Sequence, residues 1–164
     1  MSTSDDPLSR HTDYGQIPLE EGSLSSDPIE QCRVWLEEAD REGIYEPNAM
    51  VLATVEADQT PRVRTVLLRG VSDEGFAFYT DYSSQKGRAL MANPAVAAVF
   101  PWYSLHRQIK IRGRAEKVSE EDSDAYFSSR PRDSRISAWA SDQSQPIDSR
   151  AGLEDKVTQM QQKF

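Results

Sequence analysis

The β-rich segments of this chain follow one another across short polar turns, and this spacing restricts its fold more than any other feature. The runs AMVLATVEA (49–57) and RVRTVLLRG (62–70) are separated only by DQTP. A connection this short suits a hairpin and excludes the long crossover that parallel strands need. Three further runs follow at 75–81, 95–105 and 107–118. We therefore predict a mainly antiparallel β barrel of five strands with flanking helices.

The run at 107–118 also indicates which of its side chains face the core. Ile109, Ile111 and Gly113 alternate with four polar residues, Gln108, Lys110, Arg112 and Arg114. An alternation with a period of two predicts a strand with one buried and one exposed face.

Helix signals surround the β-rich part. Asp27 followed by Pro28 is typical of a helix start, and Gly43 supplies the stop. Further helices are predicted at 83–94, 119–129, 131–141 and 152–164.

The length of 164 residues suits one domain. Residues 1–26 are rich in Ser, Asp and Glu without apolar periodicity, so we expect a flexible N-terminal arm followed by a domain at 27–164. Cys32 is the single cysteine, and the sequence shows neither a secretory signal nor an apolar run long enough to span a membrane. We expect a soluble, cytoplasmic protein that does not bind membranes.

The net charge of -8 conceals a basic central part. Residues 62–135 hold 13 of the 19 Lys and Arg residues but 9 of the 27 Asp and Glu residues, which is +4, so the remainder is -12. A basic middle within an acidic chain suits a small anionic ligand and argues against nonspecific nucleic-acid binding. The alternative is that these Lys and Arg side chains are simply solvated.

Several chemistries lack the residues they need. The only histidines are His11 and His106, so no zinc-type ligand cluster is expected, and no glycine-rich nucleotide motif or nucleophile elbow occurs. Arginine and hydroxyl residues remain, most densely in RPRDSRIS (130–137). Such residues hold phosphates through guanidinium forks and hydroxyl donors.

Five motifs together resemble the pyridoxine (pyridoxamine) 5'-phosphate oxidase family: RTVLLR, FYTDYSSQKG, FPWYSLHRQIKIRGRAEKVS, YFSSRPRDSRISAWASDQS and DPIEQCRVWLEEA. SRPRDSRISAWASDQS is the most specific of these strings, and the likeness extends over nearly the whole chain from about residue 27. The resemblance implies a split-barrel fold that binds flavin mononucleotide (FMN), and a homodimer with two flavins at the subunit interface. It also implies oxidation of pyridoxamine or pyridoxine 5'-phosphate to pyridoxal 5'-phosphate, with the hydride passing to the flavin and oxygen reoxidising it.

The resemblance also implies two sets of site residues. The flavin set comprises Arg64, Thr65, Val66, Leu67, Leu68, Arg69, Tyr79, Thr80, Gln85, Lys86, Gln108, Gln143 and Ser144. The substrate-phosphate set comprises Arg69, Tyr126, Arg130 and Ser134, with Arg10 and Tyr14 of the arm as further contacts. No catalytic residue and no metal ligand are assigned.

Some of these residues have a plainer interpretation. Tyr126 and Trp139 could be core aromatics of the C-terminal helices, and Gln108 could be a solvated strand residue. Arg132 and Arg135 could pair with Asp133 or with solvent, so they receive no role.

The chain departs from the family pattern at Gln85, where the family usually has Arg, and at Arg69, where it usually has Lys. The Trp-Gly-Gly segment, final strands and Arg-x-His element of the family would lie beyond Phe164. A chain ending there is expected to leave a sheet edge uncovered and to have low oxidase activity. The alternative function is a noncatalytic flavin-binding or phosphovitamin-binding protein of the same fold; a split-barrel reductase for another substrate is disfavoured, because it need not retain RPRDS.

Overall fold

A computed structural model of the chain describes residue 8 and residues 19–164. The arm contacts Arg10 and Tyr14 lie outside the described residues. The helices are α1 (Pro28–Arg41), α2 (Gln85–Ala92), α3 (Glu120–Ser129), α4 (Arg132–Ala140) and α5 (Arg150–Lys163). The strands are β1 (Ala49–Val55), β2 (Pro61–Leu67), β3 (Gly70–Ser72), β4 (Gly75–Ala77), β5 (Ala95–Trp102) and β6 (Arg107–Arg114).

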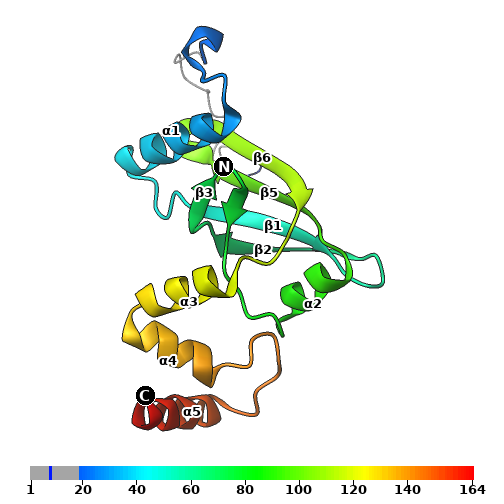
Figure 1. The fold of residues 1–164 in the computed structure, drawn as a ribbon, viewed down its shortest axis with the longest axis vertical. Helices are drawn as coiled ribbons and strands as arrows, with labels where there is room; N and C mark the ends of the chain where they lie inside the picture. Colours follow the sequence, from blue (N-terminus) through cyan, green and yellow to red (C-terminus); the bar gives the residue numbers. More distant parts are fainter. Residues whose placement is uncertain (1–7, 9–18) are drawn as a thin grey trace, which may run out of the picture.

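The strands form an antiparallel four-stranded sheet of order β2-β1-β5-β6 and a separate β3–β4 hairpin (Figure 1). The predicted antiparallel pairing and flanking helices are confirmed. The described strands do not pair into a closed ring, however, so the barrel is open in its hydrogen bonding.

The prediction of five strands was wrong around residue 69. The run 62–70 does not continue as one strand, because the chain leaves the sheet at the buried Leu68 and Gly70 begins β3. Arg69 donates its backbone N–H to the carbonyl of Ala77 at 2.8 Å, which fixes this corner against β4. Gly75 lies in the turn between β3 and β4 and has a φ of 139°, a backbone conformation that would be strained for a residue with a side chain.

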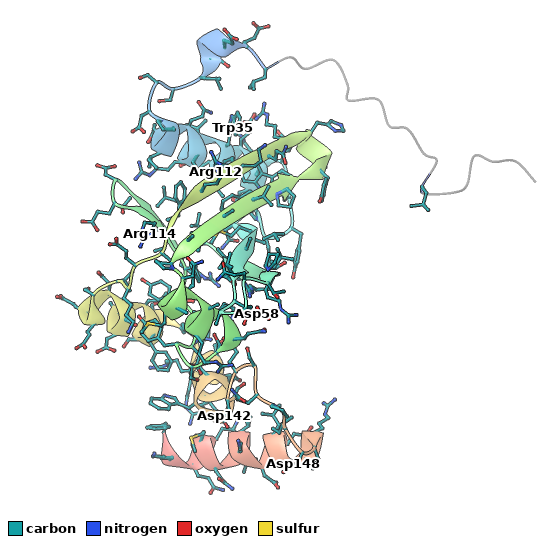
Figure 2. The ribbon with its side chains drawn as sticks, turned by 90° about the vertical axis from the view of Figure 1, so that its right-hand side faces the viewer. Trp35, Asp58, Arg112, Arg114, Asp142 and Asp148 are labelled. Atoms are coloured by element: carbon teal, nitrogen blue, oxygen red, sulfur yellow. The ribbon has the colours of Figure 1, made fainter. Side chains whose placement is uncertain are left out.

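One face of the large sheet forms the core. Met50, Leu52, Phe100 and Trp102 point to this face, where α1 and the β3–β4 hairpin cover them. On β6, Ile109 and Ile111 pack against the same core. The alternating polar residues of β6 are exposed, as predicted, and Arg112 and Arg114 follow one another along that strand in Figure 2.

Helix boundaries follow the capping residues. The side chain of Asp27 accepts the backbone N–H of Ile29 at 2.8 Å and starts α1, while the hydroxyl of Ser84 accepts the N–H of Gly87 at 3.2 Å and starts α2. Helices α3, α4 and α5 lie at the opposite end of the sheet from α1, and α4 packs against α5 (Figure 1). Within the described part of the chain, no helix has the length and apolar character to cross a membrane.

Gly87 allows the turn before α2 to fold tightly against the helix. A Cβ at this position would lie 2.4 Å from the carbonyl oxygen of Tyr82 and 2.7 Å from that of Asp81. Both are backbone atoms, so the turn and the helix would have to separate.

We expect Gly87→Ala to destabilise the protein by about 1–3 kcal/mol, because the overpacking outweighs the better helix propensity of alanine. Gly113→Ala is the matched control, since a Cβ there meets nothing within 4 Å. Urea unfolding of both variants measures the difference, and equal midpoints would contradict the clash.

Candidate cofactor and phosphate site

Three side chains that are distant in sequence meet beside the start of α2. Lys86 Nζ donates to Thr80 Oγ1 at 3.1 Å and to Gln143 Oε1 at 3.0 Å, and Thr80 Oγ1 donates to Gln143 Oε1 at 3.0 Å. Thr80 follows β4, Lys86 lies in the first turn of α2, and Gln143 belongs to the connection between α4 and α5. The structure thus brings together three of the residues predicted to bind flavin. We call them the Lys86 cluster.

Arg64 lies near this cluster on β2. Its Nη1 donates to Thr54 Oγ1 at 2.7 Å, to the Leu52 carbonyl at 3.3 Å and to the Arg62 carbonyl at 3.2 Å. Thr54 is only 1% exposed, so its hydroxyl is a fixed acceptor that orients the guanidinium.

The positive charge of Arg64 acts on Lys86. Burial lowers the pKa of Lys86 from its ordinary value of 10.5, the positive charge of Arg64 lowers it further, and Asp81 partly opposes both. Burial likewise lowers the pKa of Arg64; the negative charge of Glu56 opposes this shift, and the positive charge of Arg62 adds to it. Two partly desolvated cations therefore share one region, and a bound anion would relieve both their repulsion and their lost hydration.

Tyr126 connects the predicted flavin set with the predicted substrate set. Its ring stacks on that of Tyr79, with centroids 3.7 Å apart and planes 8° from parallel. Tyr126 is half-buried on α3. It packs against an aromatic ring, as a core aromatic would, but that ring is Tyr79, a residue of the predicted flavin set.

Arg130 and Ser134 flank the junction of α3 and α4. Arg130 is the C-cap residue of α3, and its guanidinium lies 5.8 Å from the centre of the Phe127 ring. Ser134 is half-buried near the start of α4. In the described structure no hydrogen bond joins these two side chains directly, and their joint grip on a phosphate stays a prediction.

The residues from Arg64 to Arg69 differ in burial and in the groups they contact. Leu68 is 5% exposed, and its N–H and carbonyl bond to Asn48 at 2.8 Å and 3.0 Å. Val66 packs against the core, whereas Thr65 and Arg69 are exposed. Any flavin contact by Leu67, by Leu68 or by the other members of this run stays a prediction.

Gln108 lies on β6, at the opposite edge of the sheet from Arg64 on β2. Three strand spacings separate these edges, about 14 Å. Gln108 is exposed, and no side-chain hydrogen bond in the described structure joins it to the Lys86 cluster. Ser144, with a φ of 67°, and Gln85, the first residue of α2, lie next in sequence to members of the cluster.

Two features were missed or misjudged from the sequence. Thr54, which holds Arg64, was not singled out, although its position in the alternation Met50, Leu52, Thr54 places a hydroxyl on the core face. Trp139 was expected to be a core residue but is 60% exposed; it contacts Phe127 edge-on and stacks on Phe164. Among the described side chains, no group of three or more His, Cys, Asp or Glu residues could hold a metal ion.

Residues 36–164 match the family model described as pyridoxamine 5'-phosphate oxidase. The chain belongs to this family. It is 49% identical over 152 residues to pyridoxine/pyridoxamine 5'-phosphate oxidase of Rubrobacter xylanophilus, covering 93% of this chain and 70% of that protein. The corresponding protein of Dichelobacter nodosus is 51% identical over 155 residues, with 94% and 73% covered.

Two solved structures resemble the fold of this family member. PhzG from Burkholderia lata, crystallised with tetrahydrophenazine-1-carboxylic acid, aligns with a TM-score of 0.84 at 27% identity and covers 90% of this chain and 74% of its own. An FMN-binding protein of Nostoc punctiforme related to pyridoxamine 5'-phosphate oxidase aligns with a TM-score of 0.61 at 20% identity, with 80% and 73% covered. The second likeness concerns the fold alone.

We expect the pKa of Lys86 to lie below 10.5 and to rise in Arg64→Leu, because that variant removes a neighbouring positive charge. Asp81→Asn should lower the pKa further. NMR titration of isotopically labelled lysine side chains measures both shifts, and a pKa that does not respond to Arg64→Leu would show that the two cations are not coupled.

Proposed function

We propose that this protein uses FMN to oxidise pyridoxamine or pyridoxine 5'-phosphate to pyridoxal 5'-phosphate. The observation that carries the proposal is the convergence of Thr80, Lys86 and Gln143 beside Arg64, in a chain of this oxidase family. The names of relatives such as those from Rubrobacter xylanophilus and Dichelobacter nodosus support the substrate class.

The donors of the Lys86 cluster fit the phosphate monoester of FMN. An ammonium, a hydroxyl and a nearby guanidinium supply charge-assisted hydrogen bonds, which a phosphate accepts more strongly than a neutral ligand does. A terminal phosphate matches this compact donor set, so we propose that FMN is preferred to the adenine dinucleotide. Lys86 and Thr80 would hold the phosphate, and Arg64 would add a second positive charge.

The stacked Tyr79 and Tyr126 support a second ligand site next to the first. Tyr126, Arg130 and Ser134 would hold the substrate phosphate, while Arg69 is exposed at the corner between β2 and β3. Bound FMN would supply the chemistry by accepting a hydride from the substrate carbon and passing the electrons to oxygen, which leaves as hydrogen peroxide. The amine substrate would release ammonia on hydrolysis, and the alcohol would give the aldehyde directly.

We further propose a homodimer in which Gln108 serves the flavin of the partner subunit. Gln108 and Arg64 lie at opposite edges of the sheet, which makes it hard for one chain to bring both to one ligand. On the sheet face opposite the core, at the β2 edge, Val63 is 68% exposed, and a second copy would cover this apolar side chain.

The alternative is a protein that binds FMN without oxidising the vitamin. PhzG, which has a similar fold, was crystallised with tetrahydrophenazine-1-carboxylic acid, which is not a phosphate ester, so this fold accommodates other ligands. Turnover separates the two functions.

The purified protein should therefore bind FMN more tightly than riboflavin, by about tenfold or more for each charge-assisted bond to the phosphate. Lys86→Met should reduce this difference, whereas Lys163→Met at an exposed position of α5 should not. Flavin fluorescence quenching gives the affinities. Equal binding of FMN and riboflavin would refute the phosphate site, and FMN binding without peroxide release from pyridoxamine 5'-phosphate would favour the noncatalytic alternative.

Arg130→Ala should raise the KM for pyridoxamine 5'-phosphate by about tenfold or more while leaving FMN affinity nearly unchanged, because one charge-assisted phosphate contact is lost. Arg132→Ala is the matched control, since Arg132 Nη2 donates to the Gln161 carbonyl at 3.2 Å. Steady-state kinetics with saturating FMN measure both. If Arg130→Ala weakens the binding of FMN and of substrate to a similar extent, Arg130 supports the fold and does not bind the substrate phosphate.

A further inference from the structure

We propose that Thr54 is a positioning residue for the flavin phosphate site. It holds Arg64 so that one edge of the guanidinium is ready for the phosphate, without touching the ligand itself. This inference rests on the proposed function, which gives Arg64 a part in holding the phosphate of FMN, and it adds the residue on which that part depends. Thr54 belongs to neither predicted set of site residues, yet its Oγ1 accepts a hydrogen bond of 2.7 Å from Arg64 Nη1.

Counting hydrogens shows which acceptor fixes the Arg64 side chain. Nη1 carries two hydrogens, and three protein oxygens surround it: the Thr54 hydroxyl at 2.7 Å, the Arg62 carbonyl at 3.2 Å and the Leu52 carbonyl at 3.3 Å. Two hydrogens cannot serve three acceptors equally. The shortest of the three bonds identifies the Thr54 hydroxyl as the main acceptor.

The rest of the Arg64 guanidinium is left for a ligand. Nε and Nη2 make no hydrogen bond within the described part of the chain, and neither of them is a buried atom without a partner. Solvent therefore reaches the edge formed by these two nitrogens. Their parallel N–H groups make the fork that matches two oxygens of a phosphate. With Nη1 engaged by the protein, we infer that the phosphate binds through the Nε–Nη2 edge.

Thr54 is suited to hold this side chain because it cannot move. It is 1% exposed and lies on β1, which has β2 on one side and β5 on the other. Arginine, in contrast, is long and flexible, and fixing such a side chain during binding costs conformational entropy. A guanidinium that is already held before the ligand arrives avoids much of this cost, which strengthens phosphate binding.

The surrounding charges provide a way to follow the position of Arg64. Burial lowers its pKa, with Glu56 opposing and Arg62 adding to the shift, so a guanidinium that faced a methyl group in place of the hydroxyl would turn toward solvent. The positive charge of Arg64 lowers the pKa of Lys86, while Asp81 opposes this effect. The pKa of Lys86 therefore reports whether Arg64 is in place, and it does so without any ligand.

The first test compares FMN with riboflavin in flavin fluorescence quenching of the full chain. Thr54→Val keeps the shape of the side chain and removes the hydroxyl, so we expect the preference for FMN over riboflavin to fall about three- to tenfold. Thr54→Ser restores the hydroxyl and should stay within about twofold of wild type. Thr158→Val is the matched control, because it removes a hydroxyl that donates to the Glu154 carbonyl at 3.0 Å on α5.

The second test is a double-mutant cycle with Arg64→Leu, read out by NMR titration of Lys86. Thr54→Val alone should raise the pKa of Lys86 toward its value in Arg64→Leu. Added to Arg64→Leu, it should change neither this pKa nor the preference for FMN, because Thr54 acts through Arg64. A residue that only supports the fold would not lose its effect when Arg64 is absent.

Several results would overturn the positioning role in a wild-type protein that prefers FMN. They are an unchanged preference in Thr54→Val, an equal loss of FMN and riboflavin binding, and a loss that Thr54→Ser does not restore. Thr54→Ala makes the same comparison if Thr54→Val does not fold. Equal binding of the two flavins by wild type would instead refute the proposed phosphate site, and the Lys86 titrations would still decide whether Thr54 positions Arg64.

Discussion

Leu52 lies opposite Arg64 in the antiparallel pairing of β1 with β2, and Thr54 lies opposite Arg62. Residues opposite one another share a face of the sheet, so this register puts the Arg64 guanidinium on the same side as the buried Thr54 hydroxyl that it bonds. A slip of one residue would turn Arg64 to the other face and leave Thr54 without its partner. The electrostatic relation between Arg64 and Lys86 depends on this pairing.

The site concentrates positive charge without a carboxylate in the hydrogen-bonded cluster itself. Asp81 acts on Lys86 from nearby, but its Oδ1 accepts the backbone N–H and hydroxyl of Ser83. The direct acceptors of Lys86 are a hydroxyl and an amide oxygen. Neutral acceptors satisfy hydrogen bonds without cancelling charge, so the cluster remains attractive to an anion while its polar atoms are not left unbonded.

Features of the structure that depend on neighbouring residues, such as helix starts and strand faces, could be predicted from the sequence. The Asp27 and Pro28 pair marked the start of α1, and the alternation along 107–118 identified the exposed face of β6. The break at Leu68 was not visible, because a continuous β-rich run does not show where a chain turns away from a sheet. The Lys86–Gln143 bond joins residues 57 apart, so only the family motifs placed both in one site, and they did not show that the two side chains bond each other. The interpretation of Trp139 as a core residue was wrong for a related reason, because helical spacing does not tell whether another element covers an aromatic side chain.

The outer strand β6 has a consequence for how copies of this chain can meet. Its backbone edge is available for pairing in the described sheet, but Lys110, Arg112 and Arg114 recur along its exposed face. Antiparallel addition of a second β6 would set these cations beside one another, and like charges across neighbouring strands repel. The strand thereby disfavours growth of the sheet by addition of a second copy along the β6 edge.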